Sequence, residues 1–193
     1  MTLGERSSLA AVALTVGDAL RRHGIRAVLT GGACASLHTR GTYSSRDMDF
    51  ILAGTTTQDQ LDAAMATVGF RRRGDRYLHP HVVFYAEFPR GLLAIGGDYR
   101  ITPIERRGKQ GRALILSATD SCRDRLAAFY HWSDRGSLDV AVSIALRNRL
   151  RLPVVRRWSI EEGFAGGFSE FLREVRRARA RRRGKPKKAI KHG

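Results

Sequence analysis

Residues 29–50 read LTGGACASLHTRGTYSSRDMDF, and this stretch decides how the chain folds. Residues 25–29, Ile-Arg-Ala-Val-Leu, are mostly apolar and predict a short buried strand, which ends at the glycine pair 31–32. The small residues 33–38 are compatible with a helix packed closely on a sheet. Residues 47–52 alternate polar and apolar side chains before an apolar end, which predicts a second strand. A glycine turn therefore lies between a strand and a helix, and an Asp-x-Asp pair opens the next strand.

Three carboxylates in two predicted strands form the candidate metal site. Side chains alternate between the two faces of a strand, so Asp47 and Asp49 point to the same side, about 7 Å apart. Glu87 interrupts the apolar residues 82–88, which predict a neighbouring strand. Each piece alone also fits an ordinary loop or a solvated strand end. Together they favour a site for Mg²⁺ or Mn²⁺, because hard cations prefer oxygen ligands and because unneutralised like charges destabilise a fold.

Several residues around these carboxylates are candidates for binding phosphate. Gly31 and Gly32 allow backbone N–H groups to approach a phosphate at the positive end of the following helix. Arg46 can contact a triphosphate, or it can balance the charge of Asp47, and the sequence favours neither interpretation.

Two charged residues of the later, helical part of the chain are further candidates. Arg125 and Asp139 can face the cleft from predicted helices. The alternative for Asp139 is a solvated helix face or an ion pair with Arg135, four residues before it.

The chain as a whole predicts an α/β fold with a mixed sheet, followed by helices. We expect an α/β catalytic domain at 1–116, a helical region at 117–172 that packs on it, and a basic tail at 173–193. The predicted helices cover residues 9–22, a segment capped by Thr57 that runs through Val68, and a segment opened by Ser117 or Thr119. Further helices are predicted from Ser133 or Ser137 to 146, from a capping box at 159–162, and from a cap at Ser169. The predicted strands after residue 68 cover 70–73, 76–78, 82–88, 92–95 and 113–116.

The quoted stretch resembles the signature of the DNA polymerase β-type nucleotidyltransferase superfamily. The resemblance is carried by Leu29-Thr30-Gly31-Gly32-Ala33, Leu37-His38 and Ser44-Ser45-Arg46-Asp47-Met48-Asp49-Phe50, and it extends over residues 27–146. Within the superfamily, the chain is most similar to the abortive-infection type toxins and their bacterial relatives. Later blocks around Glu87, Arg125 and Asp139 are similar to such relatives as well.

This resemblance implies a nucleotidyltransferase fold and a two-metal transfer of a nucleotide from a nucleoside triphosphate to an acceptor hydroxyl. Asp47 and Asp49 would bridge the ions, Glu87 would bind the ion at the acceptor, and Gly31, Gly32 and Ser45 would cradle phosphates. One position departs from the pattern, because the toxin branch usually has lysine where this chain has Arg125. Arginine cannot act as a neutral base, although it can clamp a phosphate.

The strong positive charge of the chain indicates polyanionic partners. The net charge is +17, and ten of these charges lie from Arg173 onward, where seven arginines and four lysines face one glutamate. Such an arm binds nucleic acid through phosphates without reading sequence, although it also fits a solubilising tail. We therefore expect RNA, tRNA in particular, as the acceptor, with a cognate antitoxin as a further partner of a toxin.

The remaining sequence features concern location and rival functions. Cys34 and Cys122 are far apart in the sequence, and no apolar run is long enough for a membrane span. We expect a cytoplasmic protein without a membrane partner. The main rival function is a catalytically silent nucleotidyltransferase-fold protein that holds RNA. A DNA-associated protein is a third possibility, for which no groove-reading motif is evident.

Overall fold

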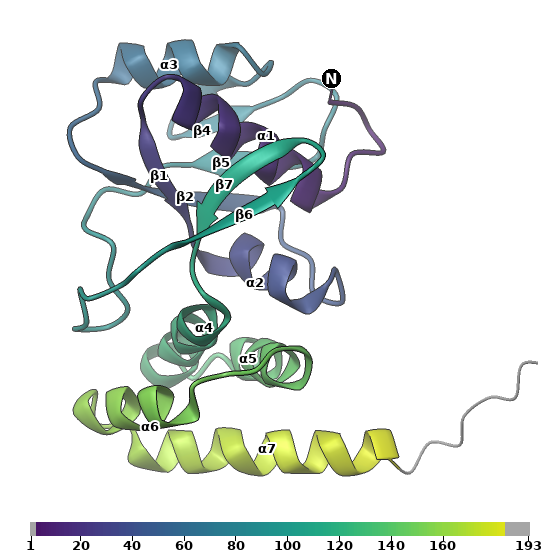
Figure 1. Ribbon diagram of the computed structural model, residues 1–193, viewed down its shortest axis with the longest axis vertical. Coiled ribbons are helices and arrows are strands. Elements are labelled where there is room, and N and C mark those ends of the chain that lie inside the picture. The colour runs from purple at the N-terminus through teal and green to yellow at the C-terminus, as the bar shows by residue number, and fades with distance from the viewer. Residues whose placement is uncertain (1–2, 184–193) are drawn as a thin grey trace, which may run out of the picture.

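The computed structural model describes residues 3–183 and consists of a mixed sheet above a stack of helices (Figure 1). The helices of this part of the chain are α1 Leu9–Arg22, α2 Gly31–Thr39, α3 Gln58–Ala66, α4 Ala118–Trp132, α5 Arg135–Arg147, α6 Leu152–Glu161 and α7 Ala165–Arg183. The strands are β1 Arg26–Leu29, β2 Asp47–Ala53, β3 Arg71–Arg73, β4 Arg76–Leu78, β5 Tyr85–Glu87, β6 Ile104–Gly108 and β7 Gly111–Ile115. The predicted fold class, α/β with a mixed sheet, is confirmed.

The sheet has the strand order β3-β4-β5-β2-β1-β7-β6. Strand β1 is antiparallel to β2 and parallel to β7, and β2 is parallel to β5. The two predicted strands of residues 25–29 and 47–52 are therefore neighbours at the centre of the sheet. Helix α1 packs on β1 and β7, and it also contacts α3.

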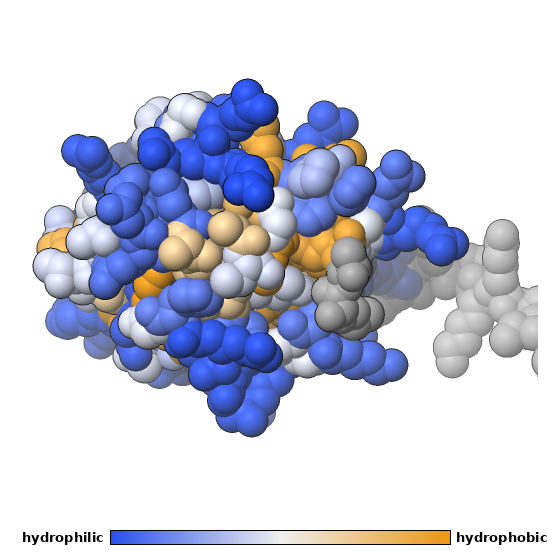
Figure 2. Space-filling view, turned by 90° about the horizontal axis from the view of Figure 1, so that it is seen from above, coloured by the Kyte–Doolittle hydropathy of each residue, from blue (hydrophilic) through white to orange (hydrophobic). Residues whose placement is uncertain are grey.

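The first helices form where the sequence provides caps and an apolar stripe. The Ser8 side chain accepts a hydrogen bond from the N–H of Ala11, and the apolar face of α1 is buried. Thr57 and Gln60 form a reciprocal capping box at the start of α3. Seen from the end where α3 lies, the surface is mostly hydrophilic, with small apolar areas between charged side chains (Figure 2).

Helix α2 begins earlier than predicted and includes the glycine pair. Gly31 has φ +62°, a conformation that glycine adopts at little cost, and it turns the chain from β1 directly into the helix. Thr30 donates from its N–H to the carbonyl of Asp49 over 2.9 Å, which fixes this turn beside β2. The glycines are therefore the first residues of the helix rather than a separate loop.

Two strand predictions need correction, and one strand was not predicted. Residues 92–95 form no strand, and only an isolated bridge joins Ile95 to Asp98. Strand β5 comprises three residues of the predicted segment 82–88. Strand β6, Ile104–Gly108, was not predicted, because all its residues are exposed at the sheet edge and no buried face marks them as a strand.

Two predicted helix starts are wrong. Ser159 lies near the end of α6, where its hydroxyl donates to the carbonyl of Val155, so the capping-box pattern at 159–162 is not a cap. Ser169 lies inside α7 and donates to the carbonyl of Ala165 in the same way. The sequence does not distinguish a serine that caps a helix from one inside it, because its hydroxyl can form a hydrogen bond with the backbone at either place.

The helical half is joined to the sheet through α2. His38 is buried, and its Nε2 lies 2.9 Å from the carbonyl oxygen of Leu116, at the end of β7. Asn148, at the end of α5, donates from Nδ2 to the carbonyl of His38 over 2.9 Å.

Helix α7 runs across the predicted boundary between residues 172 and 173. The basic residues 184–193 lie outside the described part. No described helix combines the length and the apolarity that crossing a bilayer requires.

Candidate active site

The carboxylates of β2 lie where three strands meet at the start of α2. The strand β2 pairs with β5 in parallel, and the register places Asp49 opposite Glu87 and Asp47 opposite Tyr85. The strand β1 flanks β2 on its other side and leads into Gly31. The structure thus brings the glycine turn, the Asp-x-Asp pair and the strand of Glu87 together at one end of these central strands.

The glycine pair is packed directly against the acidic strand. A methyl group at Gly31 would lie 2.6 Å from Asp49 Oδ2, and one at Gly32 would lie 2.8 Å from Ser45 Oγ. Ser45 is buried, and its hydroxyl donates to Asp47 Oδ1. Glycine is therefore required for this close approach, and Ser45 orients one of the two aspartates.

The electrostatics of Asp49 show an accumulation of negative charge. Burial, followed by repulsion from Asp47 and Glu87, raises the pKa of Asp49 to about 6. Arg125 partly offsets this rise, while Asp124 adds to it. Asp49 is thus a strand carboxyl surrounded by like charges, and a bound cation would relieve their repulsion.

The Glu87 side chain forms an ion pair with Arg76. Its Oε1 accepts a hydrogen bond from Arg76 Nε over 2.7 Å, and the guanidinium of Arg76 also lies 4.7 Å from the ring centroid of Tyr85. Within residues 3–183, no three His, Cys, Asp or Glu side chains are grouped closely enough to hold a metal. A role for Glu87 as third ligand therefore requires the Arg76 ion pair to open, and it stays a prediction.

The helical half contributes Arg125 beside the carboxylates. Its Nε and Nη2 both donate to Asp124 Oδ2, over 3.0 and 2.8 Å, and its side chain is 17% exposed. Its charge reaches Asp49, as the lowering effect on the pKa of that carboxyl shows. Arg125 is thus held by its neighbour on α4 at the edge of the site.

The structure leaves two predicted residues at the surface. Arg46 is exposed, directly before β2, and makes no ion pair with any described residue. Asp139 is exposed on α5. Arg135 forms its ion pair with Glu170 on α7 instead of with Asp139. The binding roles of Arg46 and Asp139 remain predictions.

The donor set suits Mg²⁺ carried by a nucleotide. Asp47 and Asp49 supply carboxylate oxygens, and Mg²⁺ commonly binds through one or two carboxylates together with substrate phosphates. A preformed cage of three protein ligands is not required for this mode of binding. The two aspartates therefore fit the ion that the resemblance implies.

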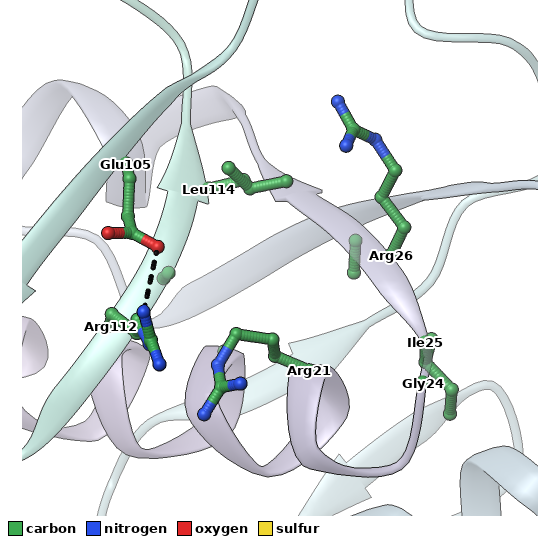
Figure 3. A pocket seen from close by; sticks show the side chains of 10 residues that line it. Arg21, Gly24, Ile25, Arg26, Glu105, Arg112 and Leu114 are labelled. Atoms are coloured by element: carbon green, nitrogen blue, oxygen red, sulfur yellow. Dashed lines mark ion pairs between the residues drawn. The ribbon is translucent and has the colours of Figure 1, made fainter.

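A cavity of about 300 Å³ lies at the other end of β1 (Figure 3). Arg21, Arg26 and Arg112 line it together with Glu105, which forms an ion pair with Arg112 at 3.6 Å. Because β1 begins at this cavity and ends at the glycine turn, the cavity is separate from the carboxylates.

Comparison with known proteins supports the fold that this geometry indicates. No family model and no curated protein matches the sequence. Among solved structures, an antigenic nucleotidyltransferase-like protein from Paracoccidioides brasiliensis matches with a TM-score of 0.54 at 15% identity, over 78% of each chain. The chain has a nucleotidyltransferase-like fold. The antibiotic-resistance factor ANT(2'')-Ia matches with a TM-score of 0.42 at 12% identity, over 80% of this chain and 95% of that one, which is too weak to carry an argument.

Sequence reasoning missed the partners of the candidate residues. Arg76 lies opposite Glu87 across β4 and β5, a register that only the strand pairing reveals. Asp124 holds Arg125, and Tyr43 has its hydroxyl 3.1 Å from a methyl placed on Gly32. The one sequence signal for the position of Arg76 was the predicted pair of strands around the turn at Gly74, because Arg76 begins the second of them, β4.

Proposed function

We propose that the protein transfers a nucleoside monophosphate from a nucleoside triphosphate to an acceptor hydroxyl. The observation that carries this proposal is the packing of Gly31 against Asp49 at the start of α2, with Asp47 two residues earlier on the same strand. The glycine turn offers backbone donors to phosphate, and the aspartates offer oxygens to a cation, at one edge of the sheet. The nucleotidyltransferase-like fold is consistent with this use.

The residues of the chain divide the work between binding and orientation. Gly31 and Gly32 let the acidic strand pack directly against the start of α2, whose backbone N–H groups would bind phosphate, and Ser45 holds the Asp47 carboxylate in place. Bound Mg²⁺ supplies charge stabilisation of attacking and leaving oxygens in phosphoryl chemistry. Positioning of the acceptor hydroxyl against the nucleotide is the remaining contribution of the protein.

Glu87 and Arg125 have narrower roles in this proposal. Glu87, released from Arg76, serves as the third carboxylate near the acceptor. Arg125 lies near Asp49 and carries a permanent charge, so it stabilises phosphate and does not act as a base. Arg46 and Asp139 are assigned to substrate binding at the rim.

RNA, tRNA in particular, is the proposed acceptor, because the chain carries a net charge of +17. A toxin of the abortive-infection type, with an antitoxin partner, is the more specific form of this proposal. It rests on the sequence resemblance alone. A cytoplasmic location is part of the same interpretation.

The test is label transfer from each of the four α-labelled triphosphates to total RNA in the presence of Mg²⁺ or Mn²⁺. The proposal predicts label in RNA with one triphosphate preferred, and no label without the divalent ion. Label in protein would assign another acceptor. Triphosphate binding without transfer to RNA, protein or small molecules would instead support the catalytically silent RNA-binding protein.

A further inference from the structure

A second charged cleft lies between the loop before β6 and the starts of α4 and α6. Its volume is about 420 Å³. Four arginines and two aspartates line it, and we call it the arginine cleft. These residues are Arg100, Arg123, Arg151, Arg157, Asp98 and Asp120.

The floor of the arginine cleft is a buried ion-pair network. The Arg123 side chain is 3% exposed and donates from Nη2 to Asp98 over 2.6 Å and from Nη1 to Asp120 over 2.9 Å. Its guanidinium also lies 5.1 Å from the ring centroid of Trp158. Asp98 also pairs with Arg100 Nε over 3.1 Å. The two aspartates therefore neutralise Arg123 and Arg100, and they leave Arg151 and Arg157 without a carboxylate partner in the cleft.

The rim of the cleft carries the positive charge that is available to a ligand. Arg151 is exposed and forms no ion pair with a described residue. The Arg157 side chain is 71% exposed, and its carboxylate partner, Glu161, is 3.9 Å away and does not line the cleft. Exposed arginines of this kind bind phosphate through paired N–H donors. Counted together, the lining residues leave an excess of two positive charges.

The register of the sheet places this cleft in relation to the candidate active site. Phe50, which follows Asp49, pairs with Leu29, Leu29 pairs with Ile115, and Ile115 pairs with Ile104. Ile104 lines the arginine cleft. Three steps between strands amount to about 14 Å. A ligand that occupies both places must therefore carry phosphates at several points along its length, as a nucleic acid strand does.

We propose that the arginine cleft binds backbone phosphates of the RNA acceptor, an inference that rests on the proposed transfer to RNA. Arg151 and Arg157 are the phosphate-binding residues. Tyr99, which is 64% exposed beside Arg100, offers a ring on which a base can stack. The acceptor strand then runs from this cleft across the ends of strands β6, β7, β1 and β2 to the carboxylates.

The test compares two double variants that remove the same charge. R151A/R157A alters the cleft, and R71A/R73A removes two exposed arginines of β3, at the far edge of the sheet. Binding of a fluorescein-labelled oligouridine to the full chain is measured by anisotropy over a series of KCl concentrations, without divalent ions or triphosphate. R151A/R157A should weaken binding several-fold and flatten the log–log salt dependence by about 0.7 for each phosphate that the variant no longer neutralises. R71A/R73A should have little effect on either quantity.

Equal losses of affinity in the two variants would overturn the proposal, because total charge alone would then explain binding. Calorimetry with Mg²⁺ and tripolyphosphate separates the other source of phosphate. Tripolyphosphate affinity should be the same in R151A/R157A and in the wild type. If that affinity falls while oligouridine binding is retained, the arginines serve the nucleotide and the proposal is wrong.

A second variant guards against a folding defect. R157E reverses a single exposed charge and should weaken oligouridine binding more than R157A. Wild-type affinity in R157E would also overturn the proposal. Since the RNA measurement needs no catalysis, a failure of label transfer leaves this test unaffected.

Discussion

Replacing Asp49 with asparagine should stabilise the metal-free protein at neutral pH. The pKa of this carboxyl rises from 3.8 to about 6 on folding, chiefly through burial and then through repulsion from Asp47 and Glu87. This difference in pKa corresponds to at most roughly 3 kcal/mol, and solvent screening of the partly buried carboxyl lowers that value. Since the folded-state pKa is the higher one, the folded protein binds the proton more tightly. The contribution of Asp49 to stability is therefore fully present below about pH 4 and is lost as the pH rises through about 6.

The D49N variant cannot ionise at this position, so its advantage over the wild type should grow with pH. We expect a gain of about 1 to 3 kcal/mol above pH 7 and about half of that at pH 5. The assay is urea unfolding across this pH range with a chelator present. The control D75N removes an exposed charge in the turn between β3 and β4 and should change stability by less than about 0.5 kcal/mol. Parallel pH profiles for D49N and the wild type would refute the reasoning.

Three further predictions concern the surroundings of the carboxylates and the tail. G31A places a methyl against a carboxylate at a positive φ, so it should lower stability by about 1 kcal/mol or more in thermal melts, whereas G166A, in open space on α7, should not; equal melting temperatures would contradict this. R76Q frees Glu87 from its ion pair and should tighten Mn²⁺ binding several-fold by calorimetry, and unchanged affinity would argue against Glu87 as a ligand. Deleting residues 184–193 should flatten the salt dependence of RNA binding by about 0.7–0.9 for each phosphate that the tail neutralises, and an unchanged slope would reject a binding role for the tail.

Much of the fold could be predicted because its signals are local. The helix of residues 9–22 and the cap at Thr57 depend on neighbouring residues, and both appear in the structure as predicted. Strand β6 pairs with its sequence neighbour β7 across a short turn, but it has no buried face, so it leaves no periodic pattern of apolar residues in the sequence. Ser159 and Ser169 misled because a serine that bonds back within a helix looks, in sequence, like one that caps a helix.

The candidate site was predictable where its residues are close in the sequence. The proximity of Asp47 and Asp49 follows from strand alternation, and the glycine turn follows from a short stretch of sequence. The engagement of Glu87 by Arg76 depends on the register of β4 against β5 and could not be read from spacing. Arg125 was expected near the carboxylates from its predicted helix and from the resemblance, but the packing of α4 against α2 that brings it there could not be read from the sequence.

The most direct test of nucleotidyl transfer at Asp47 and Asp49 is single-turnover label transfer beside triphosphate affinity, for the wild type, D47N and E87Q. The account predicts that D47N weakens both triphosphate binding and transfer. It predicts that E87Q keeps triphosphate affinity nearly intact while transfer falls at least about a hundredfold, because removing a transition-state interaction of several kcal/mol has that effect on rate. Transfer by D47N at the wild-type rate would contradict the account.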